Sequence, residues 1–134
     1  MPSIRGLGEV VLWVRDMDRA LAFYRDVLGL EVMSPPDMRG ARFLRAGAAA
    51  VSCPQQIVLV PLPSEAASFP NAREQRPLHH LGFEVAPEEF DAWRARLETQ
   101  GFSPRLGEHP FLPLRGMYLD DPDGNEVELI AGKS

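Results

Sequence analysis

The sequence repeats itself at half its length, and this feature limits the possible folds more than any other. In the first half, an apolar run at residues 9–14 precedes a helix-like segment that ends at Gly29. In the second half, residues 80–85 precede a similar segment that ends at Gly101, at an offset of about 71 residues. Each copy is too short to bury one face of a sheet alone, so we expect the two copies to pack together.

Later elements repeat in the same order. Residues 43–44 correspond to residues 118–119 at an offset of 75, and residues 57–60 correspond to residues 127–130 at an offset of 70. Each copy therefore predicts a strand, a helix and then two or three strands, which is an α+β arrangement.

We expect a single domain over residues 1–134, with a first module at about 7–62 and a second at about 78–131. Between them, the prolines and small polar residues of about 63–77 are typical of a linker.

The two predicted helices, residues 16–28 and 87–100, have signals at both ends. Asp16 suits the N-cap of the first helix, and Pro87 suits the first turn of the second. A glycine, which favours a left-handed C-cap, follows each helix. Apolar residues at helical spacing form one face of each helix: Ala20, Phe23, Tyr24, Val27 and Leu28 in the first, and Phe90, Trp93 and Leu97 in the second.

Composition excludes several classes of function. A chain that is 45% hydrophobic and 25% charged is typical of a soluble globular protein. The net charge of −5, without a run of Lys or Arg, argues against nucleic acid and anionic membrane surfaces as partners. The single Cys53 cannot form an internal disulfide, and no segment approaches the roughly 18 apolar residues of a membrane span. We therefore expect a cytoplasmic protein.

Strand alternation places polar side chains on the sheet faces that point away from the helices. By the repeat, four positions on these faces are equivalent: Glu9, Val58, His80 and Glu128. Three of the four are metal-ligand residue types, and one imidazole with two carboxylates would suit a divalent cation. The sequence therefore predicts a metal site at Glu9, His80 and Glu128.

Two alternatives remain open for these residues. They are either strand-end groups that reach water or a hydrogen-bonded His–Glu pair. Without a cation, two inward carboxylates would repel each other, and the pKa of one would rise. The other histidines, His79 and His109, are expected at the surface or at the rim of a site.

Three segments resemble the signatures of the vicinal oxygen chelate superfamily, which includes glyoxalase I, extradiol dioxygenases, methylmalonyl-CoA epimerase and the fosfomycin and bleomycin resistance proteins. Residues 12–30 (LWVRDMDRALAFYRDVLGL) are similar to its opening signature. Residues 79–85 (HHLGFEV) resemble the start of its second module, and residues 117–129 (MYLDDPDGNEVEL) its closing signature. The resemblance covers nearly the whole chain. It implies two paired βαβββ modules whose curved mixed sheets form an open cup around a metal ion.

Carried over position by position, the resemblance implies that His80 and Glu128 are metal ligands. The first-strand position, usually His in the family, is Glu9 here, and the fourth position is Val58. Gln56 lies two residues before Val58 on the same face. An oxygen-rich set of this kind implies Mn, Fe, Zn or Mg as the divalent ion. The family also implies a homodimer, and open sheets have edges to cover.

The leading hypothesis is a metal-dependent enzyme of the lyase or isomerase type, in which the ion stabilises an oxyanion or enolate of a small-molecule substrate. Gln56 could then act as a polar orienting group, and Glu9, if it is not bound to the ion, as a base. A ring-cleaving dioxygenase is less favoured, because its iron normally takes two imidazoles and only His80 points inward.

The competing hypothesis is a metal-free small-molecule binding protein of the bleomycin-resistance type, in which Trp13 and Tyr118 offer stacking surfaces to the ligand. A third possibility is a regulatory or partner-binding domain. Fold resemblance alone does not decide among the three.

Overall fold

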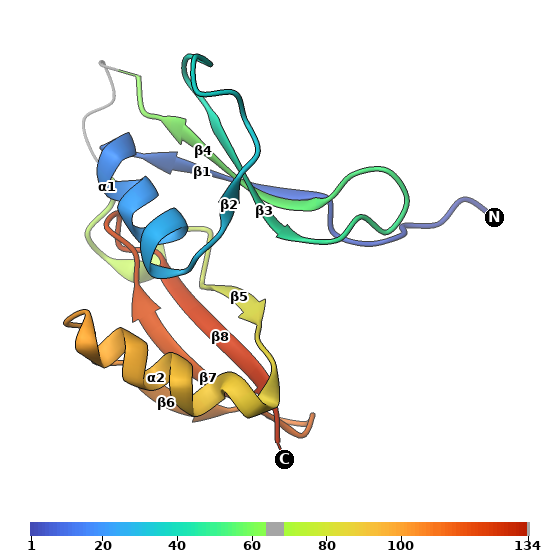
Figure 1. The fold of residues 1–134 in the computed structure, drawn as a ribbon, viewed down its shortest axis with the longest axis vertical. Coiled ribbons are helices and arrows are strands. Elements are labelled where there is room, and N and C mark those ends of the chain that lie inside the picture. The colour runs from blue at the N-terminus through green and yellow to red at the C-terminus, as the bar shows by residue number, and fades with distance from the viewer. Residues whose placement is uncertain (64–68, 134) are drawn as a thin grey trace. The chain divides into compact units, whose positions relative to one another are not determined.

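The computed structural model describes residues 1–63 and 69–133, and the chain divides into two compact units, Met1–Ala67 and Ser68–Ser134 (Figure 1). The boundary between the units falls within the predicted linker at about 63–77. Residues 64–68 of that linker lie outside the described residues. No helix in the described part of the chain is long and apolar enough to cross a membrane.

The first unit is a βαβββ unit with one mixed sheet. Its elements are β1 (Glu9–Val14), α1 (Met17–Leu21), η1 (Ala22–Val27), β2 (Glu31–Val32), β3 (Arg42–Gly47) and β4 (Gln55–Pro61). The strand order is β1-β4-β3-β2, with β1 parallel to β4 and the other pairs antiparallel.

The second unit has the same topology. Its elements are η2 (Arg73–Gln75), β5 (Leu81–Glu84), η3 (Pro87–Glu89), α2 (Phe90–Thr99), β6 (Arg105–Glu108), β7 (Leu114–Asp120) and β8 (Glu126–Gly132). The strand order is β5-β8-β7-β6, and again only the first pair is parallel. Within each unit the helix lies along one face of the sheet (Figure 1). Both sheets are open, and the predicted homodimer, which depends on such edges, stays a prediction.

Strand pairing confirms the α+β fold and the internal repeat. In the first unit Val58 lies between Val11 of β1 and Phe43 of β3. In the second unit Glu128 lies in the same way between Gly82 of β5 and Tyr118 of β7. The offsets of 71, 75 and 70 residues are thus matched by three corresponding strands in each sheet.

The helix ends agree with the predicted caps. Asp16 accepts a hydrogen bond from the amide of Arg19 at 3.1 Å, as an N-cap does. Gly29 and Gly101 have φ angles of 78° and 92°, the left-handed conformation that glycine adopts without strain. One feature was not predicted: the second half of the first helix, η1, is π-helical.

Each unit has its own apolar core, placed as the alternation predicts. On the helix side of β1, Leu12 and Val14 are buried. On the other face, Val11 and Trp13 are 52% and 53% exposed. The buried apolar residues are Leu12, Val14, Ala20, Leu21, Phe23, Tyr24, Leu28, Leu44, Ile57, Val58 and Leu59 in the first unit, and Leu81, Phe90, Leu97, Met117, Leu119, Val127, Leu129 and Ala131 in the second. Trp93, expected in the buried face of α2, is only half-buried.

The turn between β7 and β8 is organised by one buried carboxylate. Oδ1 of Asp121 accepts hydrogen bonds from the amides of Asp123 at 2.9 Å and Asn125 at 2.8 Å. Its Oδ2 accepts from the side-chain amide of Asn125 at 3.0 Å. Gly124 supplies the left-handed position with a φ of 84°. Asp121 therefore fixes the hairpin from which β8 runs back across the sheet.

We expect Asp121→Ala to lower the free energy of unfolding by about 2–3 kcal/mol, because buried donors that lose a charged acceptor keep their desolvation cost. Urea denaturation measures the loss. Asp37→Ala, in an exposed turn, is the control and should leave stability within about 0.5 kcal/mol. Equal midpoints for the two variants would contradict this role of Asp121.

Candidate functional site

The Glu128 carboxylate lies in a space left open by two glycines on neighbouring strands. A Cβ atom on Gly116 of β7 would collide with this carboxylate, reaching its Cδ at 3.0 Å. A Cβ on Gly82 of β5 would lie 3.6 Å from Oε1 of Glu128 and 2.8 Å from the side chain of Ile130. Glu128 is only 8% exposed. The sheet thus holds an acidic side chain against its own backbone.

His80 lies beside this carboxylate, one residue before β5 begins. Its Nε2 is 3.4 Å from Oε1 of Glu128. Its ring also meets the ring of Tyr118 edge to face, with the centroids 5.7 Å apart. The structure therefore places His80 on the Glu128 side of the sheet, the side that strand alternation assigned to it.

Tyr118 is the cross-strand partner of Glu128, and the two side chains interact. The phenol donates a hydrogen bond to the Glu128 carboxylate, which, with partial burial and the nearby negative charge, raises the pKa of Tyr118 to about 12. The sequence predicts a stacking role for Tyr118 and gives no sign of this hydrogen bond. Its role in binding a substrate stays a prediction.

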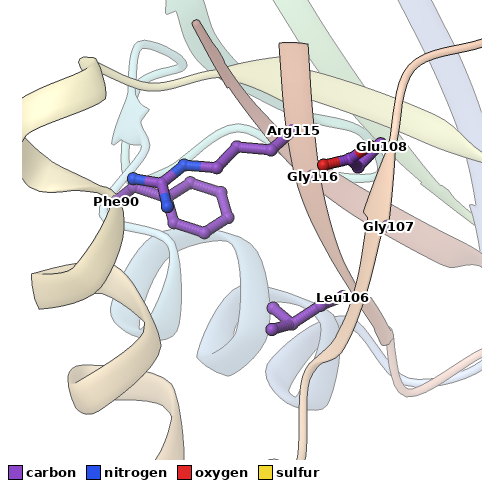
Figure 2. Close-up of a pocket in the computed structure, with 6 residues that line it drawn as sticks. All are labelled: Phe90, Leu106, Gly107, Glu108, Arg115 and Gly116. Atoms are coloured by element: carbon purple, nitrogen blue, oxygen red, sulfur yellow. The ribbon is translucent and has the colours of Figure 1, made fainter. Parts of the chain in front are cut away.

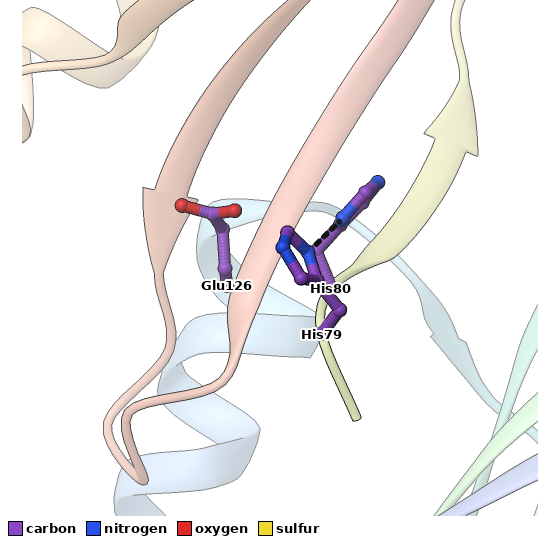
Figure 3. A group of neighbouring side chains, drawn as sticks. All are labelled: His79, His80 and Glu126. Carbon is purple, nitrogen blue, oxygen red and sulfur yellow. Dashed lines mark hydrogen bonds between the residues drawn. The ribbon is translucent and has the colours of Figure 1, made fainter. Parts of the chain in front are cut away.

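A second carboxylate nearby, Glu126, belongs to a different set of contacts. One ligand atom from each of His79, His80 and Glu126 falls within 4.8 Å of the others (Figure 3). However, Glu126 is ion-paired with Arg105 at 2.9 Å and with Arg73 at 3.4 Å. Two guanidinium groups already balance its charge, so Glu126 is a weaker cation ligand than Glu128, which lies 3.4 Å from Nε2 of the His80 imidazole.

The sequence did not predict this cluster of arginines around Glu126. Arg73 and Arg105 also approach Asp120, at 3.7 and 3.2 Å. Arg105 lies directly opposite Tyr118 in the β6–β7 pairing. A single arginine in a short strand has no periodic pattern, so its contacts with Glu126 and Asp120 could not be predicted from the sequence.

In the first unit, Glu9 and Gln56 are paired residues of β1 and β4. The side-chain amide of Gln56 donates a hydrogen bond to Oε2 of Glu9 at 3.2 Å. At the position equivalent to Glu128, Val58 is buried, and its cross-strand partner is Phe43. The first unit therefore has an apolar pair where the second has Glu128 and Tyr118. Glu9 and the His80–Glu128 pair belong to different units, so their convergence on one ion stays a prediction.

A separate pocket lies on the opposite face of the second sheet (Figure 2). It is lined by Phe90, Leu106, Gly107, Glu108, Arg115 and Gly116. The Arg115 guanidinium carbon lies 4.0 Å from the centre of the Phe90 ring, at the start of α2. Arg115 alternates with Gly116 along β7, so its side chain is on the helix side, away from Glu128.

The fold is therefore α+β, with two open βαβββ units, the second of which carries an acid and a histidine on one strand face. The chain belongs to the Glyoxalase/Bleomycin resistance protein/Dioxygenase superfamily, whose family model matches residues 6–129.

Relatives with curated functions are longer proteins. The chain is 32% identical over 130 residues to the biphenyl-2,3-diol 1,2-dioxygenase of Paraburkholderia xenovorans, covering 92% of this chain and 40% of that protein. It is 28% identical over 129 residues to the catechol-2,3-dioxygenase of Bacillus subtilis, covering 95% of this chain and 41% of that protein. The chain thus spans about two fifths of the length of these relatives.

Solved structures match over the full length. The lactoylglutathione lyase of Agrobacterium tumefaciens superposes with a TM-score of 0.69 at 26% identity, covering 98% of this chain and 96% of that one. A glyoxalase/dioxygenase from Nostoc punctiforme gives 0.74 at 20% identity, covering 100% and 99%. At this identity the second match supports the fold alone.

The Tyr118–Glu128 contact predicts a titration result. Tyr118 should ionise near pH 12, and Glu128→Gln should return its pKa toward the ordinary 10.0, because the acceptor loses its charge. The hydrogen bond of the neutral phenol to Glu128 contributes fully to the free energy of unfolding below pH 10. This contribution is lost as the pH rises toward 12, because the unfolded chain loses the phenol proton first.

The measurement is ultraviolet absorbance of phenolate in a Tyr24→Phe background, where Tyr118 is the only tyrosine left. Glu108→Gln, on the other face of the sheet, is the control. A Tyr118 pKa that does not respond to Glu128→Gln would show that the two groups are not in contact.

Proposed function

We propose that the protein is a metal-dependent enzyme acting on a small molecule, with a divalent ion held by Glu9, His80 and Glu128. The observation that supports this most strongly is the Glu128 carboxylate, buried between two glycines and 3.4 Å from Nε2 of His80. A buried carboxylate requires compensation of its charge, and a cation shared with an imidazole nitrogen provides it.

The residues present fit a divalent ion. A neutral imidazole and a carboxylate are donors that Zn, Mn and Fe accept, and a second carboxylate shifts the set toward oxygen ligands. The glycines matter here, because the carboxylate lies where a larger residue at position 116 would put its own side chain. The identity of the ion is open among Mn, Fe, Zn and Mg.

A bound ion would supply a Lewis acid for an oxyanion or enolate that develops on the substrate. If His80 and Glu128 alone hold the ion, the unbound Glu9 would accept a proton from the substrate, and the amide of Gln56, 3.2 Å from its Oε2, would hold that carboxylate in place. Tyr118 would keep the Glu128 carboxylate oriented through its hydrogen bond.

We favour a lyase or isomerase reaction. The similar structure from Agrobacterium tumefaciens is a lactoylglutathione lyase. The curated relatives are dioxygenases, but the proposed ligand set contains one imidazole and two carboxylates, whereas a ring-cleaving iron site normally has two imidazoles. The substrate would be a small molecule that offers oxygen atoms to the ion.

One observation favours a second candidate, a metal-free binding protein. Val11 and Trp13 are more than half exposed on the face of β1 that carries Glu9. Large exposed apolar side chains on one strand face suit a flat apolar ligand. Metal analysis of the purified protein separates the two candidates, since a near-stoichiometric ion favours the enzyme and its absence favours the binding protein.

The first test is a melting scan of wild type and Glu9→Gln, with and without excess divalent ion. A ligand that binds only the folded state at about 100 times its Kd adds about 2.7 kcal/mol of stability. Wild type should gain more than Glu9→Gln from the ion. Without the ion, Glu9→Gln should be at least as stable as wild type, because one of the two carboxylates proposed to share the ion is removed.

The control for this scan is Glu108→Gln, whose carboxylate is 71% exposed and paired with Lys133. It should respond to the ion as wild type does. If Glu9→Gln and wild type melt at the same temperature in all conditions, Glu9 and Glu128 do not share an ion, and the binding-protein hypothesis takes precedence.

The second test changes the space around Glu128. Gly116→Ala should weaken Zn²⁺ or Mn²⁺ binding by about tenfold or more, because its Cβ would displace the Glu128 carboxylate. Gly132→Ala is the matched control, since its Cβ would meet Pro87 at an ordinary 3.6 Å. Calorimetric Kd values measure the effect, and equal Kd values in both variants would exclude Glu128 as a ligand.

A further inference from the structure

His79 and His80 are joined by a hydrogen bond between like atoms. Their Nδ1 nitrogens are 2.8 Å apart, and the rings meet edge to face with centroids 5.0 Å apart (Figure 3). Two ring nitrogens at this distance require that one carries a hydrogen and the other presents a lone pair. The tautomer of either ring therefore sets the tautomer of the other.

Two arrangements satisfy this contact when both rings are neutral. In the first, Nδ1 of His80 donates to His79, so Nε2 of His80 presents a lone pair toward Glu128. In the second, Nδ1 of His79 donates to His80, and Nε2 of His80 carries a hydrogen that it can share with Oε1 of Glu128, 3.4 Å away. Only the first arrangement lets His80 bind a cation beside Glu128.

We propose that His79 is a positioning residue that sets the tautomer of His80 and thereby switches the His80–Glu128 pair between an ion-free and an ion-binding arrangement. This inference rests on the proposed metal site. Without an ion, His79 donates and His80 shares its Nε2 hydrogen with Glu128. With an ion, His79 accepts and Nε2 of His80 is free to coordinate.

Hydrogens balance between the two arrangements. On ion binding, His80 loses the hydrogen at Nε2 and gains one at Nδ1. His79 loses its hydrogen at Nδ1 and gains one at Nε2. His79 is exposed, so water can deliver and remove these hydrogens, and the total on the two rings is unchanged.

The surroundings hold His79 in position for this role. Its backbone carbonyl accepts a hydrogen bond from Nη2 of Arg73 at 3.4 Å. Arg73 is in turn ion-paired with Asp120 and Glu126, at 3.7 and 3.4 Å. The segment before β5 is thus tied to the ends of β7 and β8, which fixes the backbone from which His79 reaches His80.

The test compares three substitutions of His79 in the full chain. An Asn side chain places an amide atom where Nδ1 of His lies, a Gln side chain places it one bond farther out, and Phe offers no hydrogen bond. His79→Gln and His79→Phe should weaken Zn²⁺ binding by about 10–100-fold in calorimetry. His79→Asn should stay close to the wild-type Kd.

The same proteins are examined by long-range ¹⁵N–¹H spectra at a pH where both rings are neutral. Wild-type His80 should carry its hydrogen on Nε2 without metal and on Nδ1 with Zn²⁺. In metal-free His79→Phe, His80 should become a mixture of tautomers, and His79→Asn should restore a single one. His109→Asn, in the loop after β6, is the control and should change neither readout.

The outcomes separate this inference from the proposed function. If wild type binds no Zn²⁺, the proposed metal site is wrong, but the metal-free spectra of wild type and His79→Phe still decide whether His79 sets the His80 tautomer. If the metal-free tautomer is the same in both, the inference is wrong. It is also overturned if His79→Asn loses as much affinity as His79→Phe, because His79 would then act as a ligand itself.

Discussion

A negative charge buried against a sheet is the constraint on which the second unit depends. Glu128 is almost fully buried. On the neighbouring strand, any residue larger than glycine at position 116 would displace its carboxylate. Its carboxylate then needs polar partners, and Tyr118 and His80 supply them from the two adjacent sides. The arrangement of Glu128, Tyr118 and His80 on this face, and the glycine at position 116, thus follow from one acid that the fold keeps away from water.

Much of the fold could be predicted because it is encoded in spacing. The alternation of β1 and the capping residue Asp16 are properties of neighbouring positions, and the repeat is a property of the order of elements at a constant offset. The structure confirms all three. Strand register followed from the same alternation, so His80 and Glu128 were correctly expected on one face. The site roles of Glu9, Gln56 and Trp13 are not decided by these observations.

The contacts that could not be predicted depend on side-chain conformation across strands. The Tyr118–Glu128 hydrogen bond and the pairing of Glu126 with Arg105 join residues of different strands whose rotamers no periodicity specifies. The link between His79 and His80 was hidden for another reason: adjacent residues in an extended chain normally point apart, and these two lie just before the strand begins. The π-helical η1 likewise had no cap or spacing that distinguished it from an α-helix.

The two copies also differ in how readily each could change. In the second unit Gly82 stands opposite Glu128, whereas in the first unit Val11 stands opposite Val58. A carboxylate introduced at position 58 alone would meet a branched side chain on one strand and the ring of Phe43 on the other. A carboxylate at position 58, as a fourth ligand, is therefore not one substitution away from this sequence. The order in which such changes could accumulate is fixed by geometry, with the smaller neighbour first and the acid afterwards.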